Sequence, residues 1–166
     1  SYGEADETAM EKLAKDYRAF LDAGKTEREC VTELVREAEA NGYVNLETKL
    51  AAGEKIQPGD KVYAVGMKKV MALFHVGQEP LEKGMNILGA HIDSPRLDVK
   101  QNPLYEDTDL AYLDTHYYGG VKKYQWVAIP LAIHGVIVKK DGSVVDVVIG
   151  EDENDPIVYI TDLLIH

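Results

Sequence analysis

A histidine and an aspartate two positions apart, His91 and Asp93, have residue types and a spacing that suit metal chemistry. In an extended chain, side chains two residues apart leave the backbone on the same side. The imidazole can then bind a metal ion while the carboxylate accepts a hydrogen bond from its other ring nitrogen, which fixes the tautomer and raises the basicity of the ligand. A lone His-x-Asp tripeptide also occurs by chance, and its histidine is then an ordinary packed residue that binds no metal. A metal-binding role for the pair therefore needs support from the surrounding sequence.

The residues around the pair predict the element that positions it. Residues 85–90 form an apolar run between Gly84 and the polar and ionisable residues that begin at His91, which is typical of a buried strand. Buried strands of α/β proteins present functional side chains at their carboxyl ends. Pro95 prevents the strand from continuing in the middle of a sheet. The pattern therefore predicts a strand over residues 85–90 with His91 and Asp93 at its carboxyl end.

A longer string around the pair, residues 89–100, resembles the first metal-binding motif of the M18 family of zinc aminopeptidases, the aspartyl aminopeptidase and aminopeptidase I group. The likeness covers most of residues 84–166, and the helical N-terminal part is compatible with the family but less diagnostic. It continues in residues 102–106, 115–120, 122–126 and 150–156. The resemblance implies a metal-dependent enzyme that releases N-terminal amino acids from peptides, with two zinc ions, or other divalent metals, in the complete active site.

The resemblance also implies roles for individual residues. His91 is a zinc ligand, and Asp93 is the carboxylate that orients it and assists catalysis. His166 is a substrate-binding candidate, because a histidine at a comparable place in some relatives reaches a neighbouring subunit's active site. Ser94 and Arg96 either shape the loop of the site or serve turn and surface packing. One histidine cannot hold a zinc ion, and no later motif matches the other ligands, so we expect the N-terminal portion of a larger enzyme with an incomplete active site.

The predicted fold class is α/β: a partial zinc-peptidase α/β domain over residues 1–117, followed by part of a β-rich dimerisation domain over residues 118–166. Apolar periodicity predicts a helix over residues 5–23. Thr26 and Glu29 predict a capping box for a second helix, and both helices are expected to cover a sheet. Paired strands are predicted over residues 61–65 and 70–76, followed by a polar loop over residues 103–109. A hairpin around Asp141-Gly142 is predicted to join strands over residues 126–138 and 144–149. An acidic loop over residues 151–155 and a short strand over residues 157–160 follow.

Composition limits the classes of partner. The net charge of −11 argues against a surface for nucleic acid or anionic membranes. Cys30 is the one cysteine, which excludes an internal disulfide and fits a reducing, cytoplasmic compartment, where it is expected to be a small packing residue. No apolar run has the length of a membrane span. The apolar strands 127–138 and 144–149 need cover, which predicts a homo-oligomer, a dimer or a tetrahedral dodecamer by resemblance to the family.

Two other functional classes compete with the enzyme. A non-catalytic fragment that self-associates through its β-rich part would explain the missing ligands and remains an alternative. A nucleotide-binding α/β domain is set aside, because residues 84–89 precede no helix and lack the G-x-G-x-x-G order. His75 is interpreted as an ordinary strand residue, since no partner motif surrounds it.

Overall fold

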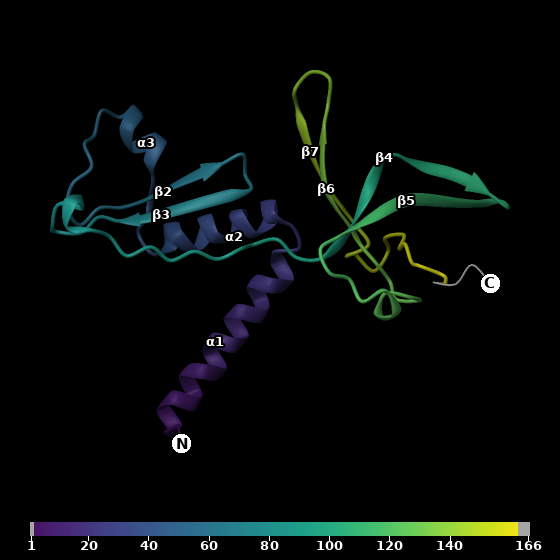
Figure 1. Ribbon diagram of the computed structural model, residues 1–166, viewed down its shortest axis with the longest axis horizontal. Coiled ribbons are helices and arrows are strands. Elements are labelled where there is room, and N and C mark those ends of the chain that lie inside the picture. The colour runs from purple at the N-terminus through teal and green to yellow at the C-terminus, as the bar shows by residue number, and fades with distance from the viewer. Residues whose placement is uncertain (1, 163–166) are drawn as a thin grey trace. The chain divides into compact units, whose positions relative to one another are not determined.

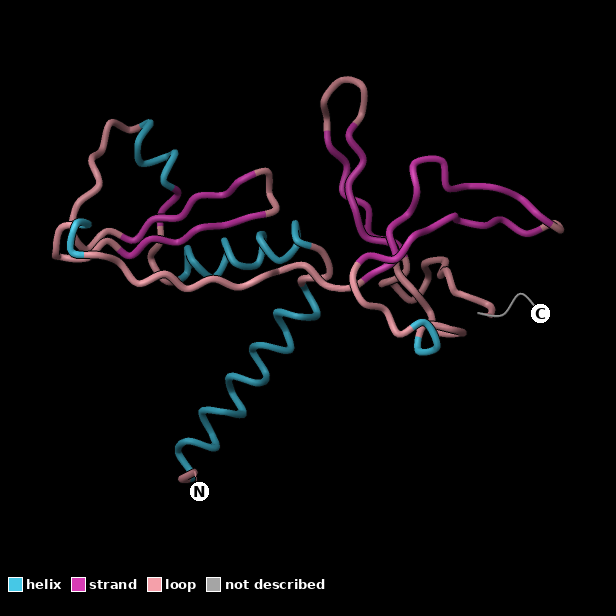
Figure 2. The backbone as a smooth tube through the Cα atoms, viewed as in Figure 1, coloured by secondary structure: helices cyan, strands magenta, loops and turns pink. Residues whose placement is uncertain are grey.

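The computed structural model describes residues 2–162 and divides into two compact units, Ser1–Asp93 and Ser94–His166. Figures 1 and 2 show the helices and strands along the chain. The first unit contains α1 (Glu4–Ala23), α2 (Glu27–Ala40), β1 (Val44–Asn45), α3 (Leu46–Ala51), β2 (Lys61–Gly66), β3 (Val70–His75) and the short 3-10 helix η1 (Leu81–Lys83). The second contains β4 (Arg96–Asp107), β5 (Leu110–Tyr118), the 3-10 helix η2 (Lys123–Gln125), β6 (Ile133–Val138) and β7 (Val144–Ile149). No helix within residues 2–162 is both long and apolar enough to cross a membrane.

Local signals explain the boundaries of the first two helices. The Glu29 carboxylate accepts a 2.8 Å hydrogen bond from the Thr26 backbone, and the Thr26 hydroxyl accepts one of 3.3 Å from the Glu29 backbone. This capping box confirms the predicted start of α2, and Asn41 ends the helix as expected. Helix α1 ends at Gly24, whose backbone N–H donates to Phe20, so the predicted helix over residues 5–23 is also confirmed.

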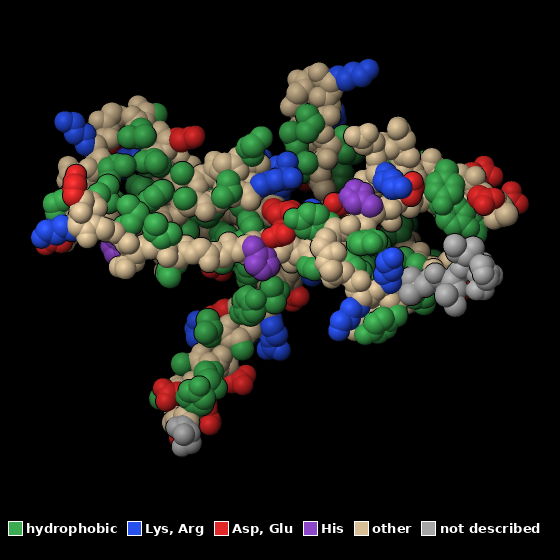
Figure 3. All heavy atoms as spheres, in the orientation of Figure 1, with side chains coloured by type: hydrophobic (Ala, Val, Ile, Leu, Met, Phe, Trp, Pro, Cys, Tyr) green, Lys and Arg blue, Asp and Glu red, His purple; other side chains and the backbone are tan. Residues whose placement is uncertain are grey.

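A small sheet in the order β1-β2-β3 forms the centre of the first unit. Strands β2 and β3 form an antiparallel hairpin, as predicted, while β1 pairs with β2 in parallel. Met67 and Lys68 both have positive φ, 52° and 57°, in the turn that joins β2 to β3. They are the central residues of a turn that the Lys69 N–H closes by donating to the Gly66 main-chain oxygen at 3.0 Å, and two consecutive positive φ angles match the twist of a hairpin. Hydrophobic side chains gather over this hairpin in the space-filling view (Figure 3).

The buried residues of the first unit join α2 to β2. Among the described residues, the buried hydrophobic side chains are Cys30, Val31 and Ala38 of α2 and Val62 and Tyr63 of β2. The Tyr63 hydroxyl donates a 2.7 Å hydrogen bond to the Glu39 carboxylate. The core therefore includes a polar contact that fixes the end of α2 against the sheet, because a buried hydroxyl is costly without a partner.

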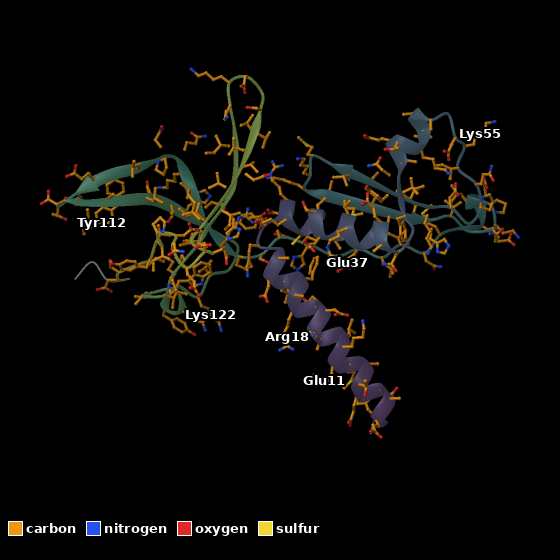
Figure 4. All side chains as sticks on the ribbon, turned by 180° about the vertical axis from the view of Figure 1, so that it is seen from behind. Glu11, Arg18, Glu37, Lys55, Tyr112 and Lys122 are labelled. Carbon is orange, nitrogen blue, oxygen red and sulfur yellow. The ribbon has the colours of Figure 1, made fainter. Side chains whose placement is uncertain are left out.

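The prediction that both helices cover the sheet holds for one of them. Helix α2 packs against β2 and β3, whereas α1 has no buried residue and meets α2 at the turn that joins the two helices (Figure 1). Glu11 and Arg18 project from α1 into open space in Figure 4. The apolar positions of α1 are also exposed, with Leu13 at 70% and Tyr17 at 59%. Amphipathic periodicity predicted the helix correctly but not what its apolar face contacts.

The predicted strand over residues 85–90 is wrong for this chain. These residues form irregular chain, and Ile87 and Leu88 are 80% and 99% exposed. A buried strand needs neighbouring strands to satisfy its backbone N–H and C=O groups and layers to cover its side chains. No described residue pairs with this segment, so its apolar composition is not accompanied by strand geometry.

The second unit begins with a long hairpin that the sequence did not predict. Strand β4 pairs antiparallel with β5, and a register shift between Val99 and Leu104 interrupts the ladder. Residues 103–107 lie in β4, so the polar loop predicted over residues 103–109 is wrong except at its last two residues. Thr108 and Asp109 form the turn, with φ of 52° and 62°. This turn lacks the glycine that usually marks such a hairpin, which explains why the signal was missed.

A second hairpin, β6–β7, confirms the prediction at Asp141-Gly142, where the Lys139 and Ser143 backbones pair and Gly142 has φ of 84°. Within residues 126–132 and 157–160, the pairing is limited to isolated bridges, Val127 with Ile160 and Leu131 with Val158. The predicted strand over 126–138 is therefore shorter, and 157–160 is not a regular strand. Residues 151–155 form a loop as expected. The predicted domain boundary at residues 117/118 falls at the end of β5, within the second unit.

Candidate functional site

His91 and Asp93 lie together at the end of the first unit. The His91 ring nitrogen Nδ1 is 3.2 Å from the Asp93 carboxylate oxygen Oδ1 and 2.9 Å from the Asp93 main-chain oxygen. The predicted proximity of the pair is therefore present, although irregular chain rather than a strand carries it. The two-residue spacing lets the chain curve so that the ring faces both oxygens of the same aspartate.

This contact fixes the chemistry of the imidazole. A main-chain carbonyl oxygen can only accept a hydrogen bond, so Nδ1 must carry the proton that it donates to Asp93. In the neutral ring the lone pair then lies on Nε2. The arrangement is the one required of a metal-binding histidine, whose second nitrogen is held by a carbonyl or a carboxylate. Nε2 of His91 is thus the atom suited to a metal ion.

The His91 side chain is open to approach, since it is 84% exposed, whereas that of Asp93 is 39% exposed. An exposed imidazole supplies one ligand, and a zinc site needs at least three protein ligands. Within the described residues, no three His, Cys, Asp or Glu side chains gather in a way that could hold a metal ion. The donor chemistry of His91 fits zinc, but the described part of the chain supplies a fraction of such a site.

Arg96 belongs to the second unit and takes part in its packing. Its Nε atom is 2.7 Å from the Asp98 carboxylate, and its guanidinium lies 4.2 Å from the centre of the Tyr118 ring. Of the two roles left open for Arg96, these contacts favour packing at the base of the β4–β5 hairpin. Ser94 is exposed at the start of the same unit.

The remaining histidines lie away from the pair in the chain. His75 is the exposed last residue of β3, which agrees with its interpretation as an ordinary strand residue. Sequence reasoning missed two other histidine–carboxylate contacts, His116 with Asp98 at 3.7 Å and His134 with Glu151 at 2.9 Å. Asp98 and His116 are paired across the β4–β5 hairpin, which was not predicted. His134 lies in β6 and Glu151 follows β7, so their contact belongs to the other hairpin. His166 lies outside the described residues.

Comparison with known proteins gives a consistent family assignment. The family model described as aminopeptidase I zinc metalloprotease (M18) matches residues 20–166. A protein of Clostridium acetobutylicum named probable M18 family aminopeptidase 1 is 62% identical over 93% of this chain, and its Thermotoga maritima counterpart is 46% identical over 95%. This chain covers 33% and 34% of those two proteins, so it spans about a third of the length of the curated relatives it matches.

Solved structures agree with the sequence comparison. The crystal structure of aminopeptidase I from Borrelia burgdorferi B31 matches 98% of this chain with a TM-score of 0.89 and 38% identity, and the chain covers 39% of it. The family model extends over most of the chain, from α1 through both hairpins. The mixed α/β fold and the region containing His91 and Asp93 are thus shared with these proteins, and the chain belongs to the aminopeptidase I zinc metalloprotease (M18) family.

Proposed function

We propose that this chain is the N-terminal part of a zinc-dependent aminopeptidase that releases N-terminal amino acids from peptides. The observation that carries the proposal is the His91–Asp93 contact, in which a carbonyl and a carboxylate hold Nδ1 and leave Nε2 for a metal ion. The family match over residues 20–166 supports the same activity.

His91 binds one zinc ion through Nε2 in the proposed active site. Asp93 holds the ring in the required tautomer, and its carboxylate favours the positive charge that the imidazole gains when it donates electron density to a metal. Zinc, when bound, acts as a Lewis acid that polarises the peptide carbonyl and activates water. The complete site holds two zinc ions, with the other ligands supplied by the rest of the enzyme, and His166 contributes to substrate binding.

The proposed full-length enzyme is a homo-oligomer in the cytoplasm, and residues 118–166 are part of its dimerisation domain. Both strands of the β6–β7 hairpin carry exposed apolar residues, including Ile137 at 57% and Val145 at 39%. Uncovered strand edges and apolar faces of this kind favour association. The S. cerevisiae protein mApe1, which has the same fold at 19% identity, is a dodecamer.

A second candidate function is a non-catalytic module that assembles through its β-rich part. It is favoured by the lack of a three-ligand cluster within residues 2–162 and by the exposed β6–β7 hairpin. The aminopeptidase hypothesis also explains the His91–Asp93 contact, because an assembly module needs no imidazole held in a metal-binding tautomer.

Hydrolysis by the full-length protein separates the two functions. Aminoacyl substrates are supplied before exhaustive chelation, after it, and after zinc is returned. We expect activity that is lost on chelation and restored by zinc. Equal turnover after exhaustive chelation would exclude a metal-dependent mechanism, and no turnover in any state would favour the assembly module.

A further inference from the structure

The first turn of α2 touches the backbone between the two candidate site residues. The Cys30 sulfur is 3.7 Å from the main-chain oxygen of Ile92, which lies between His91 and Asp93 in the sequence. The same sulfur is 3.4 Å from the main-chain oxygen of Gly24. Cys30 is 5% exposed. A buried thiol therefore connects the α1–α2 junction to the peptide that carries the site.

The position of this sulfur leaves no space at Gly24. A Cβ atom on residue 24 would lie 2.8 Å from the Cys30 sulfur and 3.1 Å from the Phe20 main-chain oxygen. Gly24 has φ of −101°, which other residues adopt readily, so the restriction comes from space and not from the backbone angle. The glycine and the thiol thus form one close-packed contact beneath Ile92.

The thiol is in the form that can donate. Burial raises the pKa of Cys30, and the neighbouring carboxylates of Glu29 and Glu27 raise it further. Cys30 therefore keeps its proton at neutral pH and acts as a small apolar group with a weak S–H donor. A serine would keep a donor, but its hydroxyl hydrogen bonds need an oxygen–oxygen distance of about 2.7–2.8 Å, which is shorter than either sulfur contact.

We infer that Cys30 and Gly24 position the peptide of Ile92, and through it the His91–Asp93 pair, for metal binding. The pair lies in irregular chain with no ladder of backbone hydrogen bonds, so contacts from α2 limit its movement. Ligand preorganisation contributes to metal affinity, because binding energy is otherwise spent on ordering the site. Cys30 is a positioning residue in this account, which rests on the proposed function.

The test uses the full-length enzyme and four variants: Cys30→Ala, Gly24→Ala, the double variant, and Ala38→Gly. Ala38 is a buried residue of the same helix two turns away, and its replacement weakens α2 without touching Ile92. Zinc affinity is measured by competition with a chelator of known affinity, well below each variant's melting temperature. The absorption spectrum of the cobalt-substituted protein reports the metal geometry, and kcat and KM are measured at saturating zinc.

We expect Cys30→Ala and Gly24→Ala each to weaken zinc binding about 3- to 10-fold, at or below the lower end of the range for groups that orient a ligand directly. Excess zinc should restore kcat, with KM unchanged. The double variant should bind zinc about as tightly as Cys30→Ala alone, because removal of the sulfur relieves the closest contact of the new methyl group, at 2.8 Å, and leaves the looser one of 3.1 Å to the Phe20 oxygen. Ala38→Gly should lower the melting temperature and leave zinc affinity and the cobalt spectrum unchanged.

Wild-type zinc affinity in both Cys30→Ala and Gly24→Ala would overturn the inference while leaving the proposed function in place. A loss of zinc affinity in Ala38→Gly equal to that in these two variants would do the same. Strictly additive losses in the double variant would show that Gly24 and Cys30 do not act through one contact, and would also overturn it. A wild-type enzyme whose activity does not depend on zinc would instead refute the proposed function and this inference together.

Discussion

The His91 ring nitrogen Nδ1 lies closer to the Asp93 main-chain oxygen, at 2.9 Å, than to the Asp93 carboxylate, at 3.2 Å. The carbonyl alone requires a proton on Nδ1, so the tautomer does not depend on the side chain of Asp93. The carboxylate adds negative charge beside the ring. Substitutions at position 93 can therefore separate the effect of charge from the effect of tautomer.

Asp93→Asn should keep most of the zinc of the full-length enzyme while lowering turnover. The amide keeps the shape of the side chain and leaves the main-chain contact in place, but it removes the charge. We expect a fall in turnover of about 10- to 100-fold, the range for loss of a group that supports a metal-binding histidine. Zinc content and kcat are measured on the same preparation. Complete loss of zinc in this variant would mean that Asp93 is itself a metal ligand.

His91→Ala should remove one metal ligand and nearly abolish activity, because loss of a direct ligand leaves too few donors to hold the ion. His75→Ala is a matched control, since His75 is an exposed histidine at the end of β3 in the same unit. Zinc stoichiometry and peptide hydrolysis are compared for both variants. Full activity in His91→Ala would refute the assignment of the site.

The parts of the fold that were predicted correctly have complete local signals. The Thr26–Glu29 capping box contains both of its hydrogen-bonding groups within four residues, and the Asp141-Gly142 turn contains the glycine that its backbone requires. The His91–Asp93 contact is equally local, so the two-residue spacing predicted that the two side chains lie together, whereas their metal-binding role was predicted from the longer surrounding motif.

The errors arose where the structure depends on distant residues. The apolar run 85–90 has the composition of a buried strand, but strand geometry requires partners that no described residue supplies. The hairpin β4–β5 has a turn of Thr108 and Asp109, whose positive φ angles occur without the glycine that usually marks such a turn. The contact of Cys30 with Ile92 joins residues 62 positions apart, and no local pattern indicates it.

Tyr63→Phe should lower the stability of the 166-residue chain by about 1 kcal/mol at neutral pH, the usual net contribution of a hydrogen bond. The variant removes the hydroxyl that donates to Glu39 at 2.7 Å and leaves the ring in the core. Urea denaturation of both proteins under identical conditions gives the difference in the free energy of unfolding. No loss in the variant would mean that this hydrogen bond adds nothing to the packing of the ring.

The same pair predicts a pH dependence. The hydrogen bond to Glu39 and, to a smaller extent, burial raise the pKa of Tyr63 above its ordinary value of 10.0. A pKa raised in the folded state gives stability that is fully present below the unfolded value and lost as pH rises through the folded value. The stability difference between wild type and Tyr63→Phe should thus be constant from neutral pH to just below pH 10 and shrink above it. A difference that persisted unchanged at higher pH would contradict the assignment.

The isolated 166-residue chain should bind zinc weakly and have no aminopeptidase activity. His91 provides one ligand, and no cluster of three ligand residues occurs within residues 2–162. Metal affinity depends on the number of ligands and on their preorganisation. Zinc stoichiometry after gel filtration is compared for this chain and the full-length enzyme. Stoichiometric zinc with peptide hydrolysis by the chain alone would show that the site is built elsewhere.

The β6–β7 hairpin provides a test of assembly in which neighbouring residues act as variant and control. Residues paired across an antiparallel ladder lie on the same face, so Ile137 and Val145 share one face with Ile133 and Ile149. That face is wholly apolar, whereas the opposite face of the hairpin includes Asp146 and His134, and His134 is paired with Glu151. If subunits associate through the hairpin, the apolar face is the one that association covers.

Ile137→Lys should therefore lower the mass of the full-length protein measured by light scattering, because a lysine ammonium is costly to bury without a partner. Val138→Lys places the same charge one residue further along β6 on the opposite face, at a site that is similarly exposed, 66% against 57% for Ile137. It should leave the mass unchanged. Melting temperatures of both variants establish that the hairpin remains folded. A monomeric wild-type protein at working concentration, or equal dissociation of the two variants, would contradict assembly through this face.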